Sequence, residues 1–138
     1  MEAVLDSLAG LGNFALYFAI SIAFLFAFKI IYAFVTPHDE WKLVKDDKNT
    51  AAAVGFAGAL IGFCIALGGA ASNSESLIDF SIWGLVAILA QTLAFALLRF
   101  TFMPTIAERI NNNEVSAGVM LAGMSVSVGI LNAACMSY

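Results

Sequence analysis

Residues 49–71, NTAAAVGFAGALIGFCIALGGAA, form an apolar stretch in which most side chains belong to Gly or Ala. About 20 apolar residues in a helix cross a hydrocarbon core of about 30 Å. A second stretch of the same character, EVSAGVMLAGMSVSVGILNAAC, occupies residues 114–135. Because small residues let helix backbones approach closely in a membrane, the sequence predicts that both stretches are packed inside the protein.

The composition indicates an integral membrane protein. Of the 138 residues, 62% are hydrophobic and 12% are charged, and the mean hydropathy is +0.93. Soluble domains are about half apolar and a quarter charged. We therefore predict an all-α membrane protein with a single domain over residues 1–138. Its four transmembrane helices are expected at Phe14–Val35, Ala51–Ala71, Phe80–Met103 and Ser116–Cys135.

The sequence argues against several functional classes. The chain has six Lys and Arg against ten Asp and Glu, so no nucleic-acid partner is expected. No catalytic, metal-binding or dinucleotide-binding motif is present, and we expect neither an enzyme nor a cofactor. His38 beside Asp39 and Glu40 leaves a metal or proton-relay site open, but a solvated turn is favoured because no second His exists. Cys64 and Cys135 are expected to be unpaired and buried.

The small residues predict the surfaces on which the helices pack. Gly58 and Gly62 form a GxxxG step in the second span, and Ala66 continues the row one turn later. Such a row brings two backbones together and gains dispersion contacts. The positions expected to pack are Gly55, Gly58, Gly62, Ala66, Gly118, Ala122 and Gly123.

Four residues are candidates for a polar path through the membrane. Gln91 falls near the middle of the third span, and its amide needs either a partner on a neighbouring helix or a wet cavity. Asn132 lies in the last span, and Lys29 and Arg99 lie near the ends of the first and third spans. For Lys29 the simpler alternative is a side chain that reaches up to the interface.

Two loops set the predicted topology. Thr36, Pro37 and Asp39 resemble a helix start, and Trp41 is the expected anchor of a short helix in the interface. A similar segment follows Pro104. By the positive-inside rule these two loops are cytoplasmic and both termini are periplasmic. The basic residues that support this orientation are Lys42, Lys45, Lys48 and Arg109.

The two halves of the chain resemble each other. An offset of 67 places Phe28 and Pro37 on Phe95 and Pro104, and an offset of 65 aligns residues 52–65 with residues 117–130. Each repeat, at about 13–71 and about 79–138, holds two spans and a short interfacial helix. Both repeats therefore enter the membrane in the same direction, which predicts a pseudo-twofold axis along the membrane normal.

The segments TPHDEW, NTAAAVGFAGALIG and NAACMSY resemble the YjfL-like bacterial inner-membrane family, a domain-of-unknown-function family. The resemblance covers essentially the whole chain. It implies a multi-pass protein of the bacterial inner (plasma) membrane, and it implies no catalytic or ligand-binding residue.

The sequence leaves two functions open. The preferred one is a homo-oligomeric assembly in the lipid bilayer that forms a pore or a transport path, because four short spans enclose very little alone. The alternative is a structural or scaffold protein in envelope stress that recruits a cytoplasmic partner. The absence of an acidic residue at mid-membrane weighs against a cation or proton pathway.

Overall fold

A computed structural model describes residues 1–36 and 40–136, and within these ranges the chain is helical with no strand. The four long helices are α1 (Glu2–Val35), α3 (Thr50–Asn73), α4 (Leu77–Leu97) and α6 (Val115–Cys135). Between them lie the short helices α2 (Glu40–Lys45) and α5 (Ile106–Asn111) and the π-helical segment η1 (Leu98–Phe102). All four long helices are long and apolar enough to span a membrane, so the predicted number of spans is confirmed.

Two helix boundaries differ from the prediction. The first helix begins at Glu2 instead of Phe14, because the residues between them include no Pro, and Gly10 and Gly12 weaken a helix without ending it. The third helix is α-helical only to Leu97 and continues as η1. The residue before a Pro is disfavoured in the α conformation, and Met103, which precedes Pro104, has φ −140° and ψ 79°.

Most of the predicted helix start after α1 lies outside the described residues. Thr36 ends α1, and its hydroxyl donates to the carbonyl of Tyr32 at 3.1 Å. Pro37, His38 and Asp39 lie outside the described residues, so neither the predicted cap nor the metal alternative at this loop is tested. The described part of the next helix begins at Glu40.

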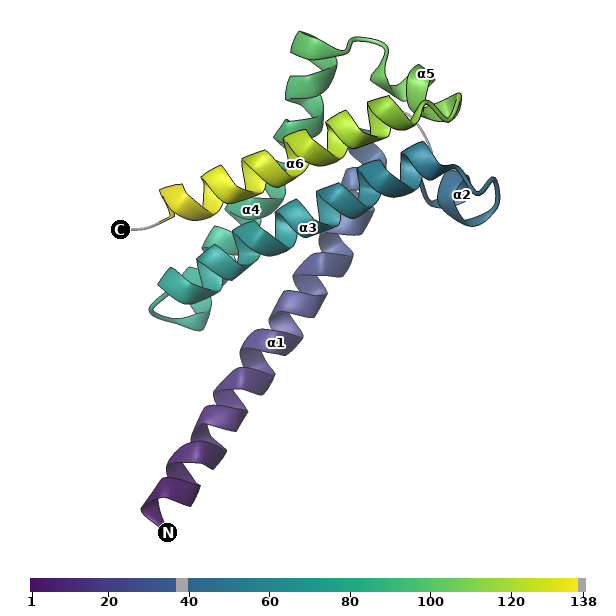
Figure 1. Cartoon of the computed structure of the whole chain (residues 1–138). Helices are drawn as coiled ribbons and strands as arrows, with labels where there is room; N and C mark the ends of the chain where they lie inside the picture. The colour runs from purple at the N-terminus through teal and green to yellow at the C-terminus, as the bar shows by residue number, and fades with distance from the viewer. Residues whose placement is uncertain (37–39, 137–138) are drawn as a thin grey trace.

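α3 and α6 lie side by side along their lengths and run in the same direction, with α2 and α5 beside their N-terminal ends (Figure 1). These two helices form the most extensive helix contact of the protein. α4 crosses behind the pair and contacts both of its members (Figure 1). The two small-residue spans therefore pack against each other within one chain.

The part of α1 that contacts this bundle begins at Tyr17, whose ring centroid lies 5.2 Å from that of Phe80 in α4, and continues toward the C-terminus of α1. Phe28 stacks on Phe63 of α3 with ring centroids 4.6 Å apart, and Phe24 meets Phe80 of α4 edge to face at 5.9 Å. Toward its N-terminus the helix diverges from the others (Figure 1), and residues 1–16 are exposed on every side. This part of α1 therefore lies outside the helix bundle.

Candidate functional site

The α3–α6 contact is an interlock of backbones at three glycines. A Cβ at Gly62 would overlap the carbonyl oxygen of Ser125, and one at Gly129 would overlap the carbonyl oxygen of Gly62. At the other end of the pair, a Cβ at Gly118 would overlap the carbonyl oxygen of Ala51. Carbonyl oxygens that lie over a neighbouring Cα recur at helix–helix interfaces. At these three glycines a side chain would fit only if the helices separated.

The predicted packing positions mostly lie in this contact. Gly58 faces Ala122, and a Cβ at Gly55 would lie 3.0 Å from the Cδ2 of Leu121. Ala66 is fully buried. Gly123 is the exception, because it is exposed and a Cβ there would meet nothing within 4 Å. Gly123 lies on the outward face of α6, away from the α3–α6 contact, so its predicted role in helix packing stays a prediction.

Gln91 of α4 reaches the middle of this interlock. Its Oε1 lies 3.0 Å from the point that a Cβ at Gly62 would occupy, and the carbonyl oxygen of Ser125 lies beside the same point. Gln91 is 1% exposed, and neither its Oε1 nor its Nε2 has a hydrogen-bond partner among the described residues. The amide therefore stands unsatisfied where α3, α4 and α6 meet, and we call this place the three-helix junction.

Two further polar atoms near the junction also lack partners. The hydroxyl of Ser125 is fully buried, and the Nδ2 of Asn132 is buried seven residues further along α6. Seven residues correspond to about 10 Å along a helix. An unsatisfied buried polar group costs about 1–3 kcal/mol, and such groups in native proteins call for a functional or hydration explanation. These groups, one on α4 and two on α6, mark this region as the candidate site.

The two cationic candidates do not join the junction. Lys29 belongs to α1, and its Nζ lies 4.2 Å from the ring centroid of Trp41 in α2. Arg99 is in η1, and its guanidinium carbon lies 5.7 Å from the ring centroid of the adjacent Phe100. Trp41 is half exposed, and its role as an interfacial anchor stays a prediction. Of the four predicted path residues, Gln91 reaches the α3–α6 contact, and Asn132 lies on α6 with its Nδ2 buried.

Sequence reasoning missed two asparagines that fasten the α3–α6 pair at its N-terminal end. The Nδ2 of Asn49 donates to the carbonyl of Ile110 at 2.8 Å, and its Oδ1 caps α3 by accepting from Ala52 at 2.9 Å. In return, the Oδ1 of Asn113 accepts from the backbone N–H of Ala51 at 3.0 Å. Asn directly before an apolar helix is a frequent N-cap, and this signal was available in the sequence.

The remaining side chains add no chemistry to the junction. No group of three His, Cys, Asp or Glu residues that could hold a metal occurs among the described residues. Cys64 and Cys135 are unpaired, as predicted, but both are exposed and not buried, and Cys64 lies on the side of α3 that faces α1. What the junction offers is neutral hydrogen-bonding capacity from an amide and a hydroxyl.

Comparison with known proteins agrees with this picture of a small membrane protein. The profile of the Domain of Unknown Function DUF350 matches residues 6–136. The chain is 42% identical over 135 residues to the UPF0719 inner membrane protein YjfL of Escherichia coli strain K12, and the match covers 98% of both chains. The same figures hold for YjfL of Escherichia coli O157:H7. No solved structure matches this chain.

Proposed function

This chain belongs to the DUF350 family of unknown function and is an inner membrane protein, and from this premise we propose that it is a transport subunit whose three-helix junction passes a small polar solute. The proposal rests on one observation. Gln91 is 1% exposed, and within the described part of the chain its amide oxygen and nitrogen have no hydrogen-bond partner. A passing hydrogen-bonding solute or water would supply these partners.

The arrangement of the helices suggests where such a path opens. α3 and α6 are locked together by backbone contacts that leave no room for a side chain, so we treat them as one rigid unit. α4 contacts this unit less extensively. A small displacement of α4 would therefore hydrate Gln91 and Ser125 without breaking the α3–α6 pair.

The charge of the lining favours an uncharged solute. α3 and α6 contain no charged residue, and α4 contains only Asp79 in its first turn. Cation and proton paths through membranes are usually marked by ionisable residues that face the interior. Neutral amide and hydroxyl groups instead match a solute that both donates and accepts hydrogen bonds, such as water or glycerol.

We further propose that the transporting unit is a homo-oligomer joined through the outward face of α6. Gly123 and Ser127 lie one turn apart and are both exposed, and the Ser127 hydroxyl bonds the Gly123 carbonyl at 2.7 Å. Small residues four apart are the usual contact of transmembrane helices. This face of α6 is unoccupied within the chain, in contrast to the face that carries Gly118 and Gly129.

The resemblance between the two halves of the sequence leads to a proposal for how the helices are arranged in the membrane. We propose two parallel repeats with α2 and α5 in the cytoplasmic interface and both termini in the periplasm. Lys48 and Asn113, which correspond by the offset of 65, both have positive φ, of 52° and 59°. Both precede the helix of the α3–α6 pair in their own half. This shared and uncommon conformation supports the repeat.

Solute flux tests the transport proposal directly. Reconstituted vesicles should take up glycerol faster than empty vesicles in stopped-flow light scattering. Gln91→Met, which keeps the length of the side chain but removes the amide, should abolish most of this difference. Thr92→Val is the matched control, because the Thr92 hydroxyl bonds the Leu89 carbonyl of its own helix and does not reach the junction. Equal rates with and without protein would contradict transport and leave the scaffold role as the remaining hypothesis.

The mass of the detergent-solubilised protein tests the assembly. Light scattering should give a multiple of the chain mass, and Gly123→Leu should reduce it to the monomer without changing the melting temperature. Gly12→Leu is the control, since a Cβ at Gly12 also meets nothing within 4 Å but lies in the N-terminal half of α1. A strictly monomeric protein would refute the oligomer.

A further inference from the structure

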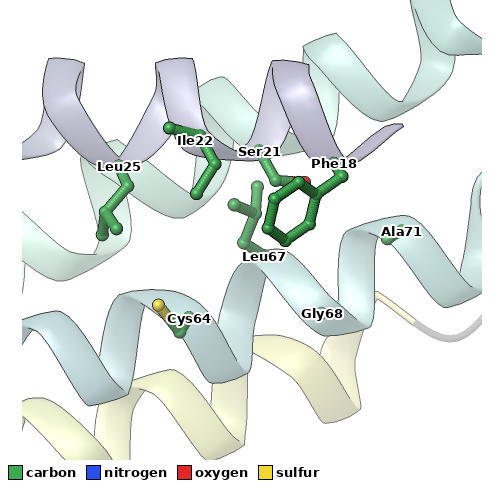
Figure 2. Close-up of a pocket in the computed structure, with 8 residues that line it drawn as sticks. All are labelled: Phe18, Ser21, Ile22, Leu25, Cys64, Leu67, Gly68 and Ala71. Carbon is green, nitrogen blue, oxygen red and sulfur yellow. The ribbon is translucent and has the colours of Figure 1, made fainter. Parts of the chain in front are cut away.

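A groove runs between α1 and α3, and it is formed by two adjoining pockets. One pocket, of about 250 Å³, is closed by Ile22 and Leu25 of α1 and by Cys64 and Leu67 of α3, whose side chains face one another in Figure 2. The other, of about 240 Å³, lies toward α2. Leu25 lines both pockets, so they meet end to end.

The groove has the length of one leaflet. Its lining on α1 extends from Phe18 to Lys29, and at 1.5 Å per residue this is about 16 Å. That length is about half of a hydrocarbon core of about 30 Å. Between Lys29 and Phe18 the walls of the groove are apolar except for the Ser21 hydroxyl, which donates to the Tyr17 carbonyl at 2.7 Å. These dimensions fit a lipid acyl chain.

The end of the groove near α2 is polar and cationic. Lys29 and Trp41 both line it, with the Nζ 4.2 Å from the ring centroid. Among the side chains that the structure describes, no carboxylate pairs with this ammonium. A lysine and a tryptophan at the mouth of an apolar groove match the level of lipid headgroups, where the ammonium can meet a phosphate and the indole can meet the ester region.

We propose that the α1–α3 groove binds a phospholipid with an anionic headgroup, with one acyl chain between Leu25 and Leu67 and the phosphate at Lys29. The groove exists because aromatic residues of α1 contact Phe63 and Phe80, and α1 diverges from α3 beyond these contacts. The lipid fills the space that this divergence leaves. Headgroup charge is what distinguishes this lipid from the surrounding bilayer, because the apolar walls accept any acyl chain.

Fluorescence quenching by brominated lipid tests the site. The chain has two tryptophans, so Trp83→Phe leaves Trp41 as the reporter. The protein is reconstituted in a fixed mixture of phosphatidylglycerol and phosphatidylethanolamine, and the bromine is placed on the chains of one lipid or of the other. We expect phosphatidylglycerol to quench Trp41 about fivefold more, per molecule, than phosphatidylethanolamine, the factor expected from one lysine near an anionic lipid.

Variants in this background separate the headgroup contact from general contact with the bilayer. Lys29→Gln should remove the preference for phosphatidylglycerol. Lys29→Arg should keep this preference, which would show that substitution at this position leaves the fold and Trp41 intact. Lys48→Gln, which removes an exposed lysine outside the groove, should also keep it. Gly68→Leu should reduce it, because a Cβ at Gly68 clashes with nothing and the larger side chain fills the groove.

Equal quenching by the two lipids would overturn the proposal, since it would mean that only annular lipid contacts Trp41. A preference that survives Lys29→Gln, or one that Lys48→Gln removes to the same extent, would also overturn it. The flux measurement on Gln91→Met is independent of these outcomes, so the lipid site and the transport proposal can fail separately.

Discussion

The α3–α6 pair and the α1 helix show two ways of placing an apolar helix in a membrane protein. Along α3 and α6, glycines allow backbone carbonyls to rest on the neighbouring helix. Along α1, aromatic rings make the contacts, as in the Phe28–Phe63 stack at 4.6 Å. The first arrangement leaves no gap, whereas the second holds the helices apart and leaves grooves of about 250 and 240 Å³.

The difference teaches what side-chain size does when lipid is the solvent. Burial of an apolar side chain in the protein gains little over lipid, so close packing has to come from contact area. Small residues maximise this area by bringing backbones together, and large residues are satisfied equally well by lipid. The rigid part of this protein is therefore its glycine-rich part, and its adaptable surface is its aromatic part.

The largest expected effect comes from inserting a side chain into the interlock. Gly62→Leu should lower the free energy of unfolding by at least about 3 kcal/mol, because the clash is with the backbone of Ser125 and only separation of the helices relieves it. Gly68→Leu, in the same helix, should change it by less than about 0.5 kcal/mol, since it faces open space. Titration with dodecyl sulfate measures both, and equal midpoints would refute the interlock.

A smaller loss is expected where α1 rests on the bundle. Phe28→Ala should lower the free energy of unfolding by about 2 kcal/mol. This loss is below the 3–5 kcal/mol expected for the core of a soluble protein, because lipid takes the place of water around the helices. Phe34→Ala is the matched control, because Phe34 is 85% exposed. The same titration applies, and an equal effect of the two substitutions would mean that α1 is held by something other than its aromatic contacts.

The N-terminal end of the α3–α6 pair can be loosened on its own. Asn49→Ala should lower the free energy of unfolding by about 1–2 kcal/mol, because α3 loses its N-cap and the carbonyl of Ile110 loses its hydrogen-bond donor. Hydrogen exchange at Ala52 should accelerate accordingly. Thr50→Ala, at an exposed neighbouring position, should leave that exchange rate unchanged, and similar rates in both variants would show that Asn49 does not fasten the pair.

The smallest expected effect is a gain in stability, and it comes from a substitution at the three-helix junction. Gln91→Met should raise the free energy of unfolding by about 1 kcal/mol, since it removes a buried amide without a partner. The melting temperature in detergent measures this, with Thr92→Val as the reference. A clear loss of stability would mean that the amide has a partner in the assembled protein and serves as structural glue.

Much of the site could be anticipated from residue types alone. Gly58 and Gly62 were predicted to pack because their spacing puts them on one face of a helix, and Gln91 was singled out because an amide at mid-membrane is costly. The sequence does not show that Gly123 faces away from Gly118 and Gly129, since the residues of α6 are small on both of its sides. The exposure of Cys64 was missed for the same reason, because a helix that is apolar all round does not reveal which side meets lipid.

By itself, the sequence determined the class of protein, the number of spans and the small-residue character of two of them. Hydrophobicity and helix length are local properties, and the thickness of the membrane converts them directly into structure. Only the tertiary structure decided that α3 and α6 meet within one chain, that Gln91 of α4 reaches their interlock, and that Lys29 closes an apolar groove. These depend on how separate helices are rotated about their axes, which is set by packing between segments that are far apart in the chain.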